Sequence, residues 1–416
     1  MLGRSVALIR GLPPTVRLLL LGTLVNKLGS FIVPYLTLVL RREFALSAGQ
    51  LGAIVAAYGV GSIVSLLVGG AITDRLGRRA ALLLSLFGSG VLAIALAWAP
   101  SLHAFVLLLV LFGFLADLYR PAAAAIIGDL LPSAERAIGF AALRLAVNLG
   151  FAVSMTLGGV FADWNWRLLF IGDGATTLLY GTIVLFLIGE TRVAGGAGAL
   201  AHAAPASPLR DGTFLLVSAS SLVFCTLIFV DFSVLPITVT LSAGYPAVVF
   251  GMLVGSNGLL IALFELPLVD ALRGRRRLRV AAVGMALSAV GFGMVGFVMH
   301  WSWFLASVLL WTAGEILVVP QQNAFIVDWA PPEARGRYLG LYQATWSLGL
   351  ALSPPLFLPL HERLGERAFW PLLTLLALPT VAVLLYLDRT ADHPELLRGA
   401  RGAALGEPAL AVEARG

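Results

Sequence analysis

Long apolar stretches separated by short polar segments dominate the chain. Twelve of them are about 20 residues long and carry few charges, which is the length that an α-helix needs to cross a lipid bilayer. We expect spans at roughly 18–40, 49–72, 80–99, 104–130, 138–161, 169–188, 213–241, 247–269, 280–299, 303–328, 338–359 and 369–387. The pattern therefore predicts an all-α integral membrane protein with twelve transmembrane helices.

Composition agrees with this prediction. The chain is 59% hydrophobic and 12% charged, with a mean hydropathy of +0.94, whereas soluble domains carry roughly twice that charged fraction. The single cysteine, Cys225, lies inside the seventh stretch, so no disulfide can form within the chain and the thiol is expected to pack as a small residue. The first stretch is too long for the apolar part of a signal peptide, so we interpret it as the first helix.

The arginines outside the spans predict the orientation of the chain. If the N-terminus is cytoplasmic, only Arg41, Arg42, Arg167, Arg363 and Arg367 fall on the outer side, and all the others fall inside. Cytoplasmic loops of membrane proteins are enriched in Lys and Arg, so both termini are expected in the cytoplasm. The net charge of +6 is then a topology signal. A nucleic-acid-binding protein would need a soluble basic face, and the pattern leaves no room for one.

The chain divides into two similar halves. We expect a cytoplasmic N-terminus at 1–17, a six-helix bundle at 18–189, a Gly/Ala-rich cytoplasmic linker at 190–212, a second six-helix bundle at 213–388 and a disordered cytoplasmic tail at 389–416. At an offset of 199 residues, 118–157 and 317–356 are identical at twelve of forty positions. Such a match is typical of a duplicated six-helix unit.

A charged, glycine-containing loop connects the second and third stretches. Residues 70–79 read GAITDRLGRR. We expect Gly70 to allow a close approach of two helix ends and Gly77 to allow a tight turn. Asp74 is expected to meet a helix N-terminus or an arginine, and Arg78 and Arg79 are expected to stay at the anionic membrane surface.

This loop resembles the G-x-L-x-D-R-x-G-R-[RK] motif of major facilitator superfamily transporters. The motif is matched at Gly70, Asp74, Arg75, Gly77 and the final pair Arg78 and Arg79. Its leucine is replaced by Ile72. The resemblance implies two pseudo-symmetric six-helix bundles, a cytoplasmic position for the loop, and transport by alternating access. In a bacterium it further implies a multi-pass protein of the cell (inner) membrane.

Charged residues that recur in both halves are expected to serve the architecture or a common gate. Asp129 and Arg136 in the first half correspond to Asp328 and Arg335 in the second, all at cytoplasmic helix ends. We expect these four residues to form gate salt bridges with the Asp74 loop.

Unmatched charges within the spans are the candidates for transport chemistry, because a charge at bilayer depth is costly and rarely retained without a function. Asp117 and Arg120 are three residues apart on the fourth span, so they share a helix face and can pair. A carboxylate near an arginine can carry a proton, since protonation and substrate binding compete for one charge. Structural pairing is the alternative.

Two further cations lie within the spans. Lys27, the only lysine of the chain, sits beside Asn26 in the first span, where it could titrate during transport or extend toward the membrane surface. Arg144 lies in the fifth span and is a candidate for pairing with substrate or with a carboxylate.

The remaining candidates are acidic or aromatic. Asp231 in the seventh span has no evident local partner, and Glu315 lies midway along the tenth span, where it could bind a proton or a cationic substrate. Tyr342 is expected to line the cavity. Asp173 and Glu265 lie nearer helix ends, so we expect them to be solvated or paired for structure.

The fifth span partly resembles drug–proton antiporters, which often carry G-x-x-x-G-P-x-x-G-G there. Gly150, Gly158 and Gly159 match, whereas Ser154 and Met155 replace the Gly-Pro pair. The resemblance favours proton-coupled export of lipophilic or cationic small molecules. Proton-coupled uptake of a metabolite and flipping of a lipid or glycolipid remain as alternatives.

Other classes of protein fit poorly. The five histidines lack the spacing of metal ligands, and no G-x-x-x-x-G-K-[ST] loop is present. We therefore expect a transporter and not an enzyme, without a cofactor, energised by a proton gradient. Its expected partners are a small-molecule substrate, protons and the lipid bilayer. A monomer is expected, since one chain contains both halves of the pathway.

Overall fold

The computed structural model of the protein describes residues 10–190, 207–272, 274–331 and 334–390. Within them, eleven helical segments are long and apolar enough to cross a membrane. The last, α16 (Arg335–Thr390), consists of two helices that meet at Gly365, whose φ is 69°. Counting both gives the twelve predicted spans. The predicted linker and tail fall mainly on 191–206 and 391–416, outside the described residues.

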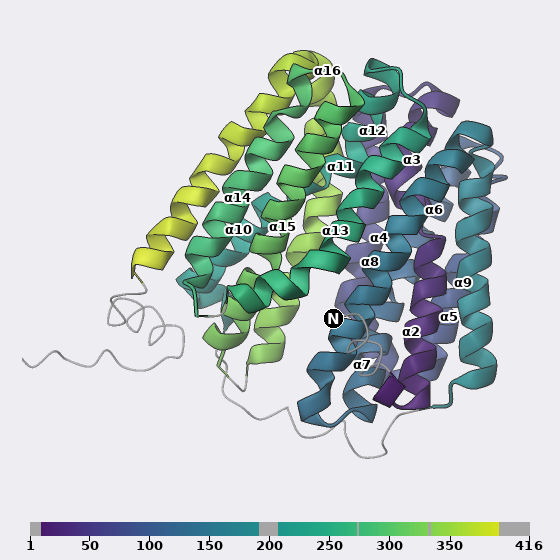
Figure 1. Cartoon of the computed structure of the whole chain (residues 1–416). Helices are drawn as coiled ribbons and strands as arrows, with labels where there is room; N and C mark the ends of the chain where they lie inside the picture. Colours follow the sequence, from purple (N-terminus) through teal and green to yellow (C-terminus); the bar gives the residue numbers. More distant parts are fainter. Residues whose placement is uncertain (1–9, 191–206, 273, 332–333, 391–416) are drawn as a thin grey trace, which may run out of the picture.

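The helices form two bundles side by side (Figure 1). The N-terminal bundle contains α2 (Pro14–Leu28), α3 (Ile32–Phe44), α4 (Ala48–Leu76), α5 (Arg78–Leu96), α6 (Leu102–Asp117), α7 (Tyr119–Leu130), α8 (Ser133–Trp164) and α9 (Arg167–Leu187). The C-terminal bundle contains α10 (Gly212–Ile228), α11 (Val230–Ser233), α12 (Leu235–Ile237), the π-helix η2 (Thr238–Ser242), α13 (Ala247–Ala271), α14 (Arg277–Gly293), α15 (Trp301–Trp329) and α16. Two 3₁₀ turns, η1 (Pro208–Arg210) and η3 (Val295–Phe297), complete this half.

Three spans are interrupted by short breaks. The first is divided into α2 and α3, the fourth into α6 and α7, and the seventh into α10, α11, α12 and η2. At the first break the backbone N–H of Ile32 donates to the Asp173 carboxylate at 3.3 Å. A carboxylate at the start of a helix satisfies free backbone N–H groups and favours the helix dipole. The break thereby brings polar backbone and a charged side chain together inside the bundle.

The two bundles meet chiefly along the helix pairs α8–α13 and α4–α16. Glycines on α13 allow the first contact: a Cβ on Gly255 would lie 2.7 Å from the Ala152 carbonyl oxygen, and one on Gly258 would lie 3.1 Å from that of Asn148. Small residues at such positions let helix backbones approach closely in membranes. The α8–α13 contact therefore depends on residues that carry no side chain.

Contact between the bundles is concentrated at the end opposite the linker, which we call the outer end; the other is the linker end. The larger hydrophobic core contains residues of both bundles, whereas the smaller one, around Leu82 and Tyr180, belongs to the N-terminal bundle alone. In Figure 1 the helices of the two bundles lie close at the top and diverge toward the linker.

Candidate functional site

A polar cavity of about 210 Å³ lies between the bundles. The N-terminal bundle supplies its charged wall, and the C-terminal bundle supplies Phe229, Phe232 and Leu350. The charged and polar lining residues include Asn26, Lys27, Asp117, Arg120, Asp173 and Thr177. One face of the cavity can thus hold charge, while the opposite face offers apolar and aromatic surface.

Asp117 and Arg120 form the ion pair that their spacing predicts. Arg120 Nε lies 2.8 Å from Asp117 Oδ1, and the hydroxyl of Ser62 donates to the other carboxylate oxygen. The Asp117 side chain is 13% exposed, whereas that of Arg120 is 60% exposed. The carboxylate is therefore compensated on both oxygens, and the guanidinium is left open to the cavity.

Lys27 and Asn26 lie on the same wall. The ammonium of Lys27 lies 5.3 Å from the centre of the Tyr119 ring, a cation–π contact. Asn26 donates to the Thr177 hydroxyl at 2.8 Å, and Thr177 donates to Asp173 at 3.4 Å. We expected Asp173 to be solvated or paired for structure. It is buried, it holds the start of α3, and it also lines the cavity.

The C-terminal bundle contains two acidic groups that interact with each other. Asn257 on α13 donates to Glu315 at 2.9 Å and to the Thr312 hydroxyl at 3.0 Å. Asp231 on α11 is 6% exposed, and its Oδ1 has no hydrogen-bond partner among the described residues. Glu315 interacts electrostatically with Asp231. Asp231 is thus a buried carboxylate next to a second acid.

Arg144 connects the bundles. Its Nη2 lies 2.9 Å from Glu265 Oε2, so an arginine of α8 is paired with a carboxylate of α13. The Glu265 side chain is 11% exposed, and the pair lines a second cavity of about 260 Å³ together with Asn148. Arg144 also interacts electrostatically with Glu315. A single cation therefore lies between two acids of the other bundle.

Tyr342 lies within the C-terminal bundle. Its ring is 1% exposed, and its hydroxyl donates to Gln322 at 3.2 Å. The arrangement links α16 to α15 by a buried hydrogen bond.

The loop between α4 and α5 corrects one of the expectations. Gly70 does not mark a close approach, because the space around it is open; the neighbouring Gly69 is the one that packs against Leu118 and Pro121. Gly77 has a φ of 94°, as a tight turn requires. Arg75 is exposed, and the side chain of Asp74 lies outside the described part of the structure.

The two arginines that end the motif bind protein groups of their own bundle. Arg78 Nε pairs with Asp129 at 3.1 Å, with side chains only 17% and 24% exposed. Arg79 donates to the Leu185 carbonyl at 2.7 Å. Both arginines thus contribute to packing at this end of the bundle, and their position at the anionic membrane surface stays a prediction.

The second half repeats this ion pair. Arg277 Nη1 lies 2.5 Å from Asp328 Oδ2, and both residues are offset by 199 positions from Arg78 and Asp129. Arg136 differs from the expected gate salt bridge, because its Nε donates to the Leu131 carbonyl at 3.1 Å. Arg335 is exposed, at the first turn of α16.

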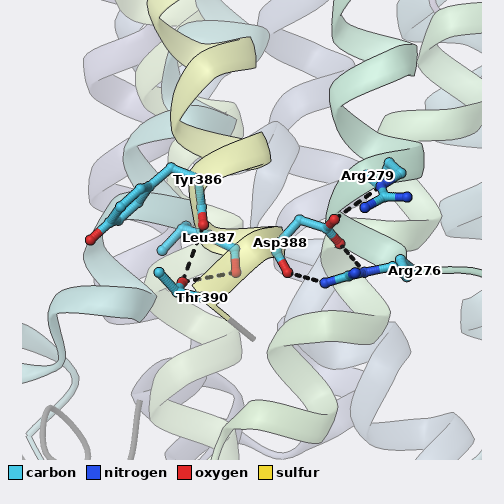
Figure 2. A network of polar contacts seen from close by, with 6 residues as sticks. All are labelled: Arg276, Arg279, Tyr386, Leu387, Asp388 and Thr390. Atoms are coloured by element: carbon cyan, nitrogen blue, oxygen red, sulfur yellow. Dashed lines mark hydrogen bonds and ion pairs between the residues drawn. The ribbon is translucent and has the colours of Figure 1, made fainter. Parts of the chain in front are cut away.

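Three acidic residues were missed by sequence reasoning. Glu190 accepts the backbone N–H groups of Arg78 and Arg79 at 3.0 and 3.2 Å, which caps α5. Asp388 binds Arg276 and Arg279 (Figure 2). Glu190 and Asp388 each lie near the C-terminal end of the last helix of their half. Comparison of the two halves could therefore have identified both residues. Asp163 lies just after the predicted fifth span, and no motif or match between the halves identifies it.

Asp163 acts at the outer end. Its two carboxylate oxygens accept the backbone N–H groups of Ala247 and Val248 at 2.8 and 3.0 Å. A residue of α8 therefore caps the N-terminus of α13 in the other bundle. Arg42 lies 3.7 Å from the same carboxylate.

Comparison with known proteins agrees with this geometry. The family described as Major Facilitator Superfamily matches residues 19–354 and 317–412. The uncharacterized MFS-type transporter YttB of Bacillus subtilis (strain 168) is 26% identical over 384 residues, covering 91% of this chain and 96% of the relative. A Na⁺, Li⁺, K⁺/H⁺ antiporter of Planococcus maritimus is 26% identical over 362 residues, covering 78% and 84%.

Two further similarities are more limited. The quinolone resistance protein NorA of Staphylococcus aureus (strain Mu50 / ATCC 700699) is 26% identical over 161 residues, covering 39% of this chain and 41% of NorA. A solved POT family transporter, in complex with a thioalcohol-conjugated peptide, shares the fold with a TM-score of 0.77 and 16% identity, covering 93% of this chain and 99% of that one.

Within the described residues, no group of three His, Cys, Asp or Glu side chains is arranged to hold a metal ion. The helices cross the membrane twelve times, in two bundles around a charged cavity. With the family matched along nearly the whole chain, this protein belongs to the Major Facilitator Superfamily and is a membrane transporter, not an enzyme.

Proposed function

We propose that this transporter couples the entry of protons to the export of lipophilic or cationic small molecules. In this proposal the linker end faces the cytoplasm and one chain acts as a monomer. The observation that carries the proposal is the buried carboxylate of Asp231, which has one oxygen without a hydrogen-bond partner among the described residues and has Glu315 nearby.

An ionised carboxylate at membrane depth costs several kcal/mol unless a cation or a proton compensates it. Within the described residues neither Asp231 nor Glu315 forms an ion pair, and Arg144 is already paired with Glu265. Two acids that share one region cannot readily both be charged. A proton, or a cationic substrate, would supply the missing charge, which is the exchange that an antiporter requires.

The cavity supports an amphiphilic cargo. Its aromatic wall, Phe229 and Phe232, offers apolar surface and π-faces that attract cations. Its opposite wall carries Asp117 and Asp173, held by Arg120 and by the start of α3. A lipophilic cation could therefore bury its rings on one side and exchange charge on the other.

The relatives support antiport. NorA, a quinolone resistance protein, matches part of the chain, which favours export of drug-like molecules. The Planococcus maritimus antiporter matches 78% of the chain and favours a second candidate, exchange of a monovalent metal cation for protons. Both candidates use the same buried acids.

The test is transport by purified protein in proteoliposomes with an imposed proton gradient. Ethidium, a Hoechst dye, Na⁺ and K⁺ would be offered separately, and proton movement would be followed with a pH-sensitive dye inside the vesicles. We expect ethidium or Hoechst to exchange for protons in the wild type and not in Asp231→Asn. Exchange with Na⁺ or K⁺ alone would favour the second candidate.

Glu43→Gln is the matched control, because Glu43 is an exposed acid at the end of α3. It should exchange protons as the wild type does. Transport of dye by the wild type without any movement of protons would contradict the proposal.

A further inference from the structure

A second open cavity, of about 310 Å³, lies at the linker end of the C-terminal bundle. It is formed where α14 begins and where α15 and α16 end, and it shares no lining residue with the cavity between the bundles. Because membrane-spanning helices begin and end here, the cavity lies at the depth of lipid headgroups. We call it the headgroup pocket.

Arginines form one side of the headgroup pocket, and Asp388 fixes the first of them. Arg276 Nε lies 3.0 Å from one Asp388 oxygen, and Arg279 Nε lies 3.1 Å from the other (Figure 2). The Asp388 side chain is 4% exposed. One buried carboxylate therefore holds two guanidinium groups beside the pocket.

Arg277 provides hydrogen-bond donors at the pocket. Its Nη1 binds Asp328 at 2.5 Å and the Ala324 carbonyl at 2.6 Å, while its Nε and Nη2 have no partner among the described residues. Guanidinium groups bind phosphate oxygens with parallel hydrogen bonds. Of the two acids in the lining, Asp388 is already held by Arg276 and Arg279, so Asp328 is the acid that would oppose an anion here. Its side chain is 65% exposed to solvent and already shares Arg277.

The other side of the pocket is apolar. Phe325 and Trp329 stack with ring centres 5.7 Å apart and an angle of 10° between their planes, and Leu278 lies beside them in the lining. The indole N–H of Trp329 donates to Asp211 at 2.8 Å, which fixes the ring. A free phosphate ion has no apolar part that could pack against this surface, whereas the glycerol and upper acyl chain of a phospholipid would pack against it.

The corresponding place in the N-terminal bundle is occupied by protein. There Glu190 accepts the backbone N–H groups of Arg78 and Arg79. The start of α14 has no side-chain cap. Among the described residues the two halves thus repeat the Arg–Asp pair, but Glu190 covers the start of α5, whereas the start of α14 lies beside an open basic pocket.

We propose that the headgroup pocket binds an anionic phospholipid, with the phosphate on Arg276 and Arg277 and the acyl end on Phe325 and Trp329. Basic pockets between membrane helices are known to take anionic headgroups. The bound lipid would hold the ends of α14, α15 and α16 together. This site is independent of the transport proposal, because it shares no residue with it.

The test uses tryptophan quenching in nanodiscs of phosphatidylcholine that contain brominated phosphatidylglycerol. We expect quenching to rise more steeply with brominated phosphatidylglycerol than with brominated phosphatidylcholine. The difference should be lost in Trp329→Phe. Arg277→Gln should weaken the preference about five-fold, which corresponds to about 1 kcal/mol for one arginine near the membrane surface.

Two variants separate binding from damage to the fold. Asp328→Asn removes the opposing acid and should strengthen the preference for phosphatidylglycerol, which a merely destabilised protein would not do. Arg210→Gln removes an exposed arginine outside the pocket and should leave the preference unchanged.

Three outcomes would overturn the proposal. They are equal quenching by the two lipids, an unchanged difference in Trp329→Phe, and complete displacement of the lipid effect by millimolar inorganic phosphate. The last would mean that the pocket binds free phosphate and not lipid.

Discussion

At the scale of residues, the acids at membrane depth differ in how well their charge is compensated. In the N-terminal bundle, Asp117 is compensated by Arg120 and Ser62, and Asp173 by the start of α3 and by Thr177. In the C-terminal bundle, Asp231 lacks a partner on Oδ1. The compensated acids can stay charged through a transport cycle, so we assign proton exchange first to Asp231.

Asp231→Asn should abolish proton-driven transport without lowering stability. An amide cannot carry the proton, yet it removes the cost of burying a charge. The measurements are proton flux in proteoliposomes and the thermal midpoint in detergent, which should equal or exceed that of the wild type. Normal flux in this variant would contradict the assignment.

Asp117→Asn should also abolish proton coupling, by a different route. The substitution leaves the Arg120 guanidinium without its counter-ion at the cavity wall. The double variant Asp117→Asn with Arg120→Gln is the control, since it removes both charges and should restore coupled transport if the unpaired guanidinium is the cause of the loss. Coupled transport in the single variant would mean that Asp117 only supports the structure.

At the scale of elements, apolar length predicted the spans because the bilayer imposes it. The second predicted span, 49–72, is observed as Ala48–Leu76, and the eighth, 247–269, as Ala247–Ala271. The break between α2 and α3 was not predicted, since the apolar run continues through it. Only the Asp173 carboxylate, about 140 residues away in sequence, satisfies the freed N–H group of Ile32.

The candidate site was predictable only where partners share a helix. Asp117 and Arg120 are three residues apart, so helix geometry alone predicts the pair. Arg144 and Glu265 belong to different halves, and neither position carries information about the other. We expected Gly70 to lie at a close helix contact, but the structure places Gly69 there. A sequence motif identifies the loop, but it does not determine which residue faces the neighbouring helix.

Gly255→Val should hinder the closed contact between α8 and α13. Its first side-chain carbon would lie 2.7 Å from the Ala152 carbonyl oxygen, and overpacking of this kind costs about 1–3 kcal/mol. We expect a roughly five- to 150-fold loss of the closed population, measured by spin-label distances across the outer end. Gly340→Val on α16 is the control, since Gly340 faces open space; an equal effect there would rule out the contact as the cause.

At the scale of the whole molecule, charges at the outer end hold the bundles together. Arg41 pairs with Glu362 across the bundles at 3.2 Å, but both side chains are largely exposed, at 35% and 50%. Asp163 instead caps α13 across the same interface with both oxygens. Exposed ion pairs contribute about 0–1 kcal/mol, whereas loss of an N-cap costs about 0.5–2 kcal/mol. Asp163 is therefore expected to be the stronger of the two connections.

Asp163→Ala should open the outer end more than Glu362→Gln does. Spin labels at Glu43 and Arg363, both exposed, would report the distance between the bundles in a chain whose single cysteine, Cys225, is replaced by serine. We expect a larger long-distance population in Asp163→Ala, with Glu362→Gln close to the wild type. If the bundles rock about the central cavity during transport, this connection must break and re-form, so Asp163→Ala should also change the transport rate. If Glu362→Gln opened the outer end as far, surface charge and not the cap would hold it closed.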